Sequence, residues 1–271
     1  MNHKSRKRAA GGLVAGGAIG ALGGLIGLGG AEFRLPVLKG IFHLETLEAV
    51  IFNKAMSLIV VTVALAARSV TILPSELLVY WPIALNLLAG SLIGAWLSAG
   101  SAIRMDAETL DFVVFTLLVG LAALMIIQHL AHPGPTAEPM LADGAVQWIA
   151  GLLAGLGIGA IAAFLGVAGG ELLIPTITLL YGVDIRLAGS LSLAISLPTM
   201  LVGMLRYAQA DQFAVLRRES GLFTGMGVGS MVGAVAGGLA IGLVAPNWLI
   251  LLLAGILILS AWKAFADARQ H

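Results

Sequence analysis

Apolar runs long enough to cross a lipid bilayer recur from one end of this chain to the other. Of its 271 residues, 59% are hydrophobic and 11% are charged, and the mean hydropathy is +1.01. About 20 consecutive apolar residues cross the hydrocarbon core as a helix. The sequence therefore predicts an all-α polytopic membrane protein, with the lipid bilayer as a partner.

Glycine is unusually frequent in these runs, at 36 residues. In membrane helices, small residues spaced four apart let two backbones approach closely. We interpret four such pairs as helix-packing positions. They are Gly16/Gly20, Gly90/Gly94, Gly225/Gly229 and Gly233/Gly237.

The two halves of the chain resemble each other. An offset of 139 residues, which places Gly27 on Gly166, brings them into register without gaps. We predict two homologous repeats, about 10–131 and 145–266, which together form a single transmembrane domain over residues 1–271. The predicted hydrophobic segments are 10–44, 48–67, 77–100 and 107–131 in the first repeat, and 145–182, 187–205, 220–244 and 247–265 in the second. The Pro- and Gly-rich stretch 132–144 is predicted to be the loop between them.

The first segment of each repeat is longer than one crossing needs, and glycines and a proline interrupt it. If it is a re-entrant hairpin, each repeat crosses three more times and the repeats are inverted. If it is a crossing plus a surface stretch, the chain makes eight full crossings and the repeats are parallel. We favour inverted repeats, because broken helices in corresponding positions of two halves often form a midplane binding site. In both arrangements the distribution of Lys and Arg places the N and C termini in the cytoplasm, with Arg68 and Arg104 on opposite faces.

Both broken segments place a glutamate directly after a run of glycines. The stretches are GLIGLGGAEFRLP, residues 24–36, and FLGVAGGELLIP, residues 164–175. A helix that restarts after such a break offers unpaired N–H groups and its positive dipole end to an anion. We therefore select the glycines beside the two glutamates as binding residues rather than packing residues. They are Gly27, Gly29 and Gly30 in the first repeat and Gly166, Gly169 and Gly170 in the second.

Glu32 and Glu171 occupy the same position in the two repeats. An ionisable residue inside the bilayer costs about 3 kcal/mol on insertion scales, so a duplicated glutamate needs an explanation. They are either interfacial carboxylates at helix N-termini or members of a binding pathway. Arg34 lies two residues from Glu32 and is not its same-face neighbour on a helix. Lys54 is the better candidate partner of Glu32.

The segment FNKAMSL, which contains Lys54, is polar at positions that recur in the second repeat. Asn53 and Ser57 correspond to Ser192 and Ser196, whereas Lys54 corresponds to Leu193. The four polar side chains either bind a substrate or hydrogen-bond helix to helix. The basic charge is specific to the first repeat.

Other motifs give no support for an enzyme. The glycine pattern 155–159 lacks the strand–helix–strand context of a dinucleotide site, and neither GxSxG nor HExxH occurs. His129 and His132 are not expected to bind a metal, the absence of cysteine excludes thiolate ligands, and no basic patch suggests nucleic acid. We predict no cofactor and no catalytic or metal site.

The duplicated motif is a glycine run with GGA or GGE, followed by Pro and two apolar residues, and the first copy is followed by Asn-Lys-x-x-Ser. This pattern resembles the TauE/SafE family of sulfite-exporter-like permeases. The resemblance extends from about Gly11 to Trp262. It implies a secondary carrier of small sulfur-containing or organic anions such as sulfite or sulfonates. Carried over residue by residue, the family motif falls on Gly27, Gly29, Gly30, Pro36, Asn53, Lys54, Ser57, Gly166, Gly169, Gly170 and Pro175. Family members often have a third glycine and an apolar residue where this chain has Ala31-Glu32 and Gly170-Glu171.

Together these observations predict an inner-membrane permease in which the two broken segments face each other. Lys54 and the helix N-termini attract a small anion, and Glu32 and Glu171 carry protons. The alternatives are a cation or metal-ion permease that uses both glutamates, and an intramembrane enzyme. The sequence leaves open whether the chain forms a homo-oligomer.

Overall fold

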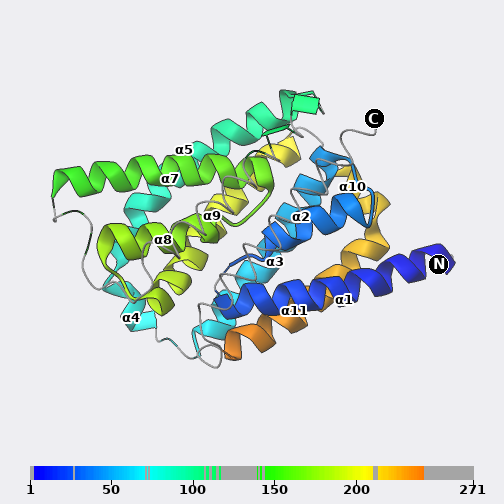
Figure 1. Ribbon diagram of the computed structural model, residues 1–271, viewed down its shortest axis with the longest axis horizontal. Coiled ribbons are helices and arrows are strands. Elements are labelled where there is room, and N and C mark those ends of the chain that lie inside the picture. Colours follow the sequence, from blue (N-terminus) through cyan, green and yellow to red (C-terminus); the bar gives the residue numbers. More distant parts are fainter. Residues whose placement is uncertain are drawn as a thin grey trace.

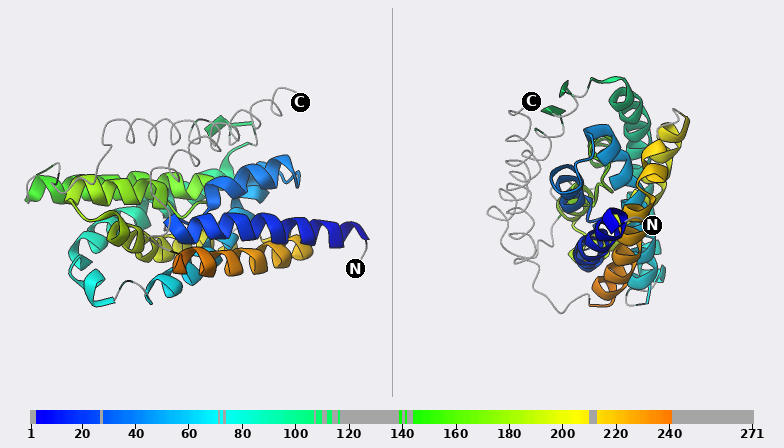
Figure 2. Two further views of the ribbon diagram at one scale, coloured as in Figure 1. Left: turned by 60° about the horizontal axis from the view of Figure 1, so that its bottom comes forward. Right: turned by 90° about the vertical axis from the view of Figure 1, so that its right-hand side faces the viewer.

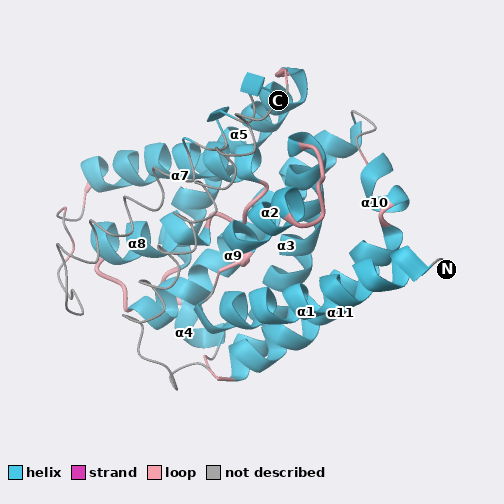
Figure 3. Ribbon diagram, turned by 45° about the vertical axis from the view of Figure 1, so that its right-hand side comes forward, coloured by secondary structure: helices cyan, strands magenta, loops and turns pink. Residues whose placement is uncertain are grey.

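Helices make up all the secondary structure in the described part of the chain (Figure 1, Figure 3). The computed structural model describes residues 3–26, 28–70, 72, 74–106, 108–109, 112–113, 116, 139, 141, 144–209 and 213–240. The helices are α1 (His3–Ile26), α2 (Ala31–Gly40), α3 (Thr46–Arg68), α4 (Pro74–Leu78), α5 (Trp81–Arg104), α7 (Ala145–Leu165), α8 (Gly170–Tyr181), α9 (Ile185–Gln209), α10 (Ala214–Arg218) and α11 (Ser220–Leu239). The predicted fourth segments, 107–131 and 247–265, fall almost entirely outside the described residues.

Six of these helices are long and apolar enough to cross a membrane. They are α1, α3, α5, α7, α9 and α11. This supports a multi-pass membrane protein that is helical in its described part. The middle helices α3 and α9 are the most deeply buried of the six and pack against each other at the centre.

Each broken first segment folds into a long helix followed by a short helix that runs back along it. After α1, Gly30 lies against Ile19, and at the end of α2 the carbonyl of Phe42 accepts a hydrogen bond of 3.1 Å from Nη2 of Arg8. The second half does the same, because Gly169 lies against Ile158 and Nε2 of Gln147 donates to the carbonyl of Leu180 at 2.9 Å. The short helices α2 and α8 are about 15 to 18 Å long, half the thickness that α1 and α7 can span.

Corresponding helices begin at corresponding positions. Three pairs of helix starts are separated by the predicted offset of 139 residues: Ala31 and Gly170, Thr46 and Ile185, and Trp81 and Ser220. The packing follows the same relation, because α1 packs against α11 while α7 packs against α5. Figure 2 shows α1 and α11 side by side along their length.

The predicted packing role of the paired glycines is confirmed. A Cβ atom at Gly16 would collide with the backbone of Met226, and one at Gly20 would collide with that of Ser230. Between α5 and α7, Gly90 and Gly94 lie in the same way against the backbone of Leu152 and Leu156. In both pairs the contacts advance in the same direction along each chain, so the paired helices are parallel. Any side chain at these glycines would have to push the two backbones apart.

Candidate functional site

The two glycine breaks meet near the centre of the molecule. A Cβ atom on Gly29 would lie 2.7 Å from the Cβ of Ala168, the residue at the corresponding position of the second half. The residues that follow, Gly30 and Gly169, have φ values of 64° and 83°, a left-handed conformation that side chains disfavour. Each then begins a short helix, because Gly30 caps α2 and Gly169 caps α8.

The N-termini of α2 and α8 lack a side-chain cap among the described residues. Neither Gly30 nor Gly169 has a side chain to accept a hydrogen bond from the first turn, and none of the described side chains forms a cap bond at either start. The first N–H groups of a helix lack partners within the helix and carry its positive dipole end. The break between α7 and α8 begins at Gly166, which also has a positive φ, of 64°, and lies against the backbone of Val50 in α3.

An arginine that the sequence analysis did not select lies beside these helix starts. Arg34 in α2 is fully buried, with 0% of its surface exposed. Its Nη1 atom donates to Oγ of Ser57 at 3.0 Å and to Oδ1 of Asn53 at 3.3 Å. The signal that could have identified it is its place in an apolar segment, because ionisable residues in the membrane are costly and usually functional.

Asn53 connects the two broken segments. Its Nδ2 atom donates to the carbonyl of Ala31 at 2.9 Å, at the start of α2, and to that of Leu165 at 3.2 Å, at the end of α7. Ser196, the counterpart of Ser57, donates to the carbonyl of Ala168 at 2.6 Å. Ser192 is also buried but donates to the carbonyl of Gly189 within its own helix. Asn53 and Ser196 therefore each contact a broken segment directly, and Ser57 does so through Arg34.

Lys54 lies on another side of α3, against α7 and α9. It is fully buried, its Nζ atom donates to the carbonyl of Ala162 at 3.4 Å, and the backbone of Gly203 leaves room for it. The hydroxyl of Tyr207, a second residue that the sequence analysis missed, donates to the next carbonyl, Ala163, at 3.1 Å. Both carbonyls also accept backbone N–H bonds from the turn after α7, and a cation near the C-terminal end of a helix is favoured by its dipole. Lys54 therefore places its amine against the C-terminal end of α7, where its hydrogen bond adds to those of the backbone.

The comparison with protein families decides the class. A family model described as "Sulfite exporter TauE/SafE" matches residues 12–264, which include both glycine breaks, Arg34 and Lys54. The chain belongs to the TauE/SafE family. Membership implies a membrane transporter, in agreement with the resemblance that the sequence motifs indicated. The comparisons with curated proteins and with solved structures give no match.

Of the two glutamates of this TauE/SafE chain, the structure describes the side chain of Glu171 but not that of Glu32. Glu171, in the first turn of α8, has 3% of its surface exposed, and its Oε1 atom has no hydrogen-bond partner in the described part of the chain. Gly27 and the side chain of Glu32 lie outside the described residues. The predicted pairing of Glu32 with Lys54 therefore stays a prediction. No group of three or more His, Asp or Glu side chains that could hold a metal ion occurs in the described part of the chain.

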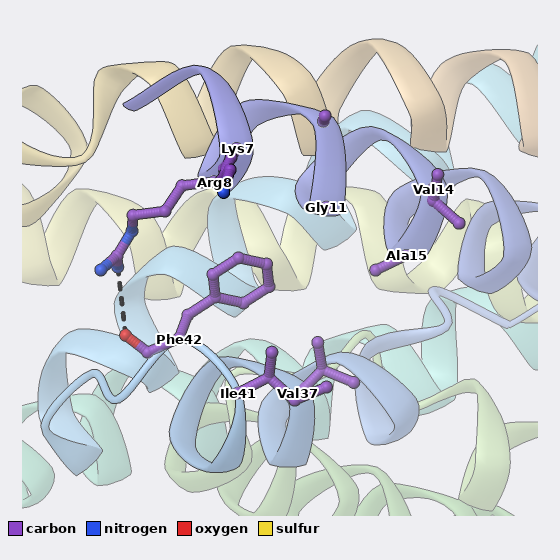
Figure 4. Close-up of a pocket in the computed structure, with 9 residues that line it drawn as sticks. Lys7, Arg8, Gly11, Val14, Ala15, Val37, Ile41 and Phe42 are labelled. Atoms are coloured by element: carbon purple, nitrogen blue, oxygen red, sulfur yellow. Dashed lines mark hydrogen bonds between the residues drawn. The ribbon is translucent and has the colours of Figure 1, made fainter. Parts of the chain in front are cut away.

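A hollow of about 730 Å³ lies away from this centre, between the N-terminal part of α1 and the end of α2. Figure 4 shows Lys7 and Arg8 at one end of it, with Val37, Ile41 and Phe42 along its wall. Nη2 of Arg8 also forms an ion pair with Glu219 at 3.1 Å, so an acidic side chain already balances its charge. The candidate site of this TauE/SafE chain consists of the buried side chains of Arg34, Asn53 and Ser57 on one side of α3 and of Lys54 on another.

Proposed function

We propose that this chain is a secondary transporter that moves a small sulfur-containing or organic anion, such as sulfite or a sulfonate, across the inner membrane. The observation that carries the proposal is the burial of two cationic side chains, Arg34 and Lys54, close to the uncapped starts of α2 and α8. An oxyanion at this point would receive charge-assisted hydrogen bonds from the guanidinium group and from backbone N–H groups.

We propose further that the domain consists of two inverted repeats, each with a re-entrant first segment. This is supported by the short helices α2 and α8, which return toward the end at which α1 and α7 began. It is also supported by the helix directions in Figure 1, where α1 and α7 run in opposite directions. In such a fold the breaks lie near the midplane, where transporters with inverted repeats place their substrate.

The distribution of basic residues supports a cytoplasmic N terminus. One end of the bundle carries most of the basic residues at helix ends in the described part of the chain, namely Arg6, Lys7, Arg8, Lys39, Arg104, Arg206, Arg217 and Arg218. The opposite end carries Arg68 and Arg186. Positive charge accumulates on the cytoplasmic side of membrane proteins. The predicted cytoplasmic C terminus lies outside the described residues.

Cysteine labelling is expected to place the ends of α3 and α5 on opposite sides of the membrane. The chain has no cysteine, so a single introduced thiol gives an unambiguous signal. Because Arg68 is buried, the label belongs on its exposed neighbour as Ser69→Cys, and the second on exposed Asp106 as Asp106→Cys. An impermeant reagent added to whole cells should modify residue 69 and leave residue 106 unmodified. Modification of residue 106 from outside would instead support eight full crossings.

Competition for flux tests the function. Purified protein in proteoliposomes is expected to take up labelled sulfite, and unlabelled sulfite, thiosulfate or a sulfonate should reduce that uptake. Divalent cations should leave it unchanged, because buried cations and helix N-termini select for negative charge. Protein-dependent uptake of a divalent cation without any uptake of these anions would favour the cation permease that uses Glu32 and Glu171.

A further inference from the structure

A second basic site lies where α5 and α9 end, at the face that carries the N terminus. A pocket of about 210 Å³ is lined there by Gly100, Ile103 and Arg104 of α5 and by Arg206 and Gln209 of α9. The two helices run in the same direction, because Ser91 hydrogen-bonds Thr199 at 2.9 Å and Gly100 lies beside Arg206 further along. The predicted binding residues are not among those that line this pocket.

The position of Arg206 is fixed by its neighbours on α5. Its guanidinium carbon lies 5.0 Å from the centre of the Trp96 ring, a cation–π contact. Gly100 leaves the space that the guanidinium group occupies, because a Cβ atom there would lie 3.2 Å from both Nε and Nη2 of Arg206. Trp96, Gly100 and Arg104 are spaced four residues apart, so they lie along one face of α5.

The charge of this pocket is uncompensated among the described residues. Neither Arg104 nor Arg206 forms an ion pair with an acidic side chain in that part of the chain, and Nε of Arg206 is buried without a hydrogen-bond partner. Two guanidinium groups that line one small pocket repel each other. An anion bound between them removes the repulsion and accepts the unused N–H groups.

The surroundings indicate a lipid as the source of that anion. Large apolar side chains of the same two helices are exposed just before the pocket, namely Ile93, Leu97, Leu201 and Leu205. Both helices are long enough to cross the membrane and end at this pocket, so it lies at the level of the headgroups. A tryptophan at the same level is typical of the membrane interface.

We propose that Arg104, Arg206 and Gln209 bind the phosphate group of an anionic phospholipid in the leaflet on the N-terminal side. Arg206, held by Trp96, presents a fixed fork to the phosphate oxygens, and exposed Arg104 closes the site from α5. The acyl chains lie along the exposed apolar side chains of α5 and α9. Basic pockets between membrane helices bind lipid headgroups by the same chemistry.

Native mass spectrometry of the purified full chain, with phosphatidylglycerol and phosphatidylcholine in competition, tests this assignment. The parent protein should retain phosphatidylglycerol in preference, and Arg104→Gln with Arg206→Gln should reduce the preference by on the order of tenfold. Arg217→Gln is the matched control, because Arg217 is exposed at the same face but outside the pocket. Arg104→Gln alone should give a smaller loss, and its exposed position keeps the test valid if the double variant does not fold.

Two outcomes would overturn the proposal. The first is an equal preference for phosphatidylglycerol in the parent protein, the double variant and Arg217→Gln. The second is a rise in melting temperature with inorganic phosphate alone that depends on both arginines, combined with no preference between the lipids. That result would assign the pocket to a free oxyanion. Neither outcome depends on whether the chain transports sulfite.

Discussion

Replacing Lys54 with methionine is expected to reduce sulfite uptake by about ten- to a hundredfold, the effect of removing one charge-assisted hydrogen bond from a buried anion. Lys54, in α3, is fully buried against α7 and α9 and is one of the two basic side chains of the proposed site. Methionine keeps much of its length without the charge. Leu193→Met, at the corresponding position of the second half, should leave uptake close to that of the parent protein. The measurement is initial uptake in proteoliposomes over a range of sulfite concentrations.

A capping role of Lys54 would give a different result, and Tyr207 provides the control. The Tyr207 hydroxyl donates to the Ala163 carbonyl as the Lys54 amine donates to the Ala162 carbonyl, so both cap the end of α7. Tyr207→Phe removes a capping bond without removing a charge. If Lys54→Met and Tyr207→Phe lower the melting temperature alike and leave the affinity for sulfite equal to that of the parent, Lys54 only stabilises α7.

Arg34 extends the same test to the residue that only the structure identified. Its guanidinium group contacts both Asn53 and Ser57, so its loss should weaken anion binding and also release these two side chains. Without Arg34, the buried Oδ1 atom of Asn53 loses a hydrogen bond, which is costly. Replacing Arg34 should therefore lower stability more than Leu193→Met does.

Replacing Glu171 with glutamine is expected to abolish accumulation driven by a pH gradient while anion exchange continues. Glu171 is almost completely buried, and its Oε1 atom has no hydrogen-bond partner among the described residues, so it is the glutamate that we assign to proton exchange. A carboxyl group that takes up and releases one proton per anion couples the two gradients. A gradient of one pH unit then supports about tenfold accumulation, because one unit corresponds to about 1.4 kcal/mol. Glutamine cannot exchange the proton, so accumulation should fall to the level without a gradient.

Glu32→Gln is the comparison within the same protein. If a basic side chain keeps Glu32 ionised throughout the cycle, its replacement should weaken binding rather than coupling. The assay is accumulation of labelled sulfite in proteoliposomes with an imposed pH gradient, alongside counterflow exchange without one. Accumulation that persists in both variants would make the two glutamates structural.

Much of the local architecture was predictable because its causes are local. Apolar composition determines a membrane-spanning helix wherever enough residues follow one another, so α3, α5, α9 and α11 begin and end within a few residues of the predicted segments. Glycine has no side chain in any context, so runs of it predicted both the interrupted first segments and the close helix pairs. The duplicated motif also identified the family before any comparison, because its residues recur at a constant offset.

The tertiary structure alone decided which side chains meet at the centre. The pairing of α1 with α11 and of α7 with α5 could not be predicted from the sequence, because it depends on contacts between residues far apart in the chain. The sequence favoured Lys54 over Arg34 by helical spacing, yet the break before α2 turns Arg34 onto Asn53 and Ser57 of α3. Likewise, Lys54 and Tyr207 reach adjacent carbonyls of α7 from two other helices. Local sequence determined where the helices break, and packing over more than 100 residues of chain determined what surrounds the breaks, because a buried charge takes the partners that the fold brings to it.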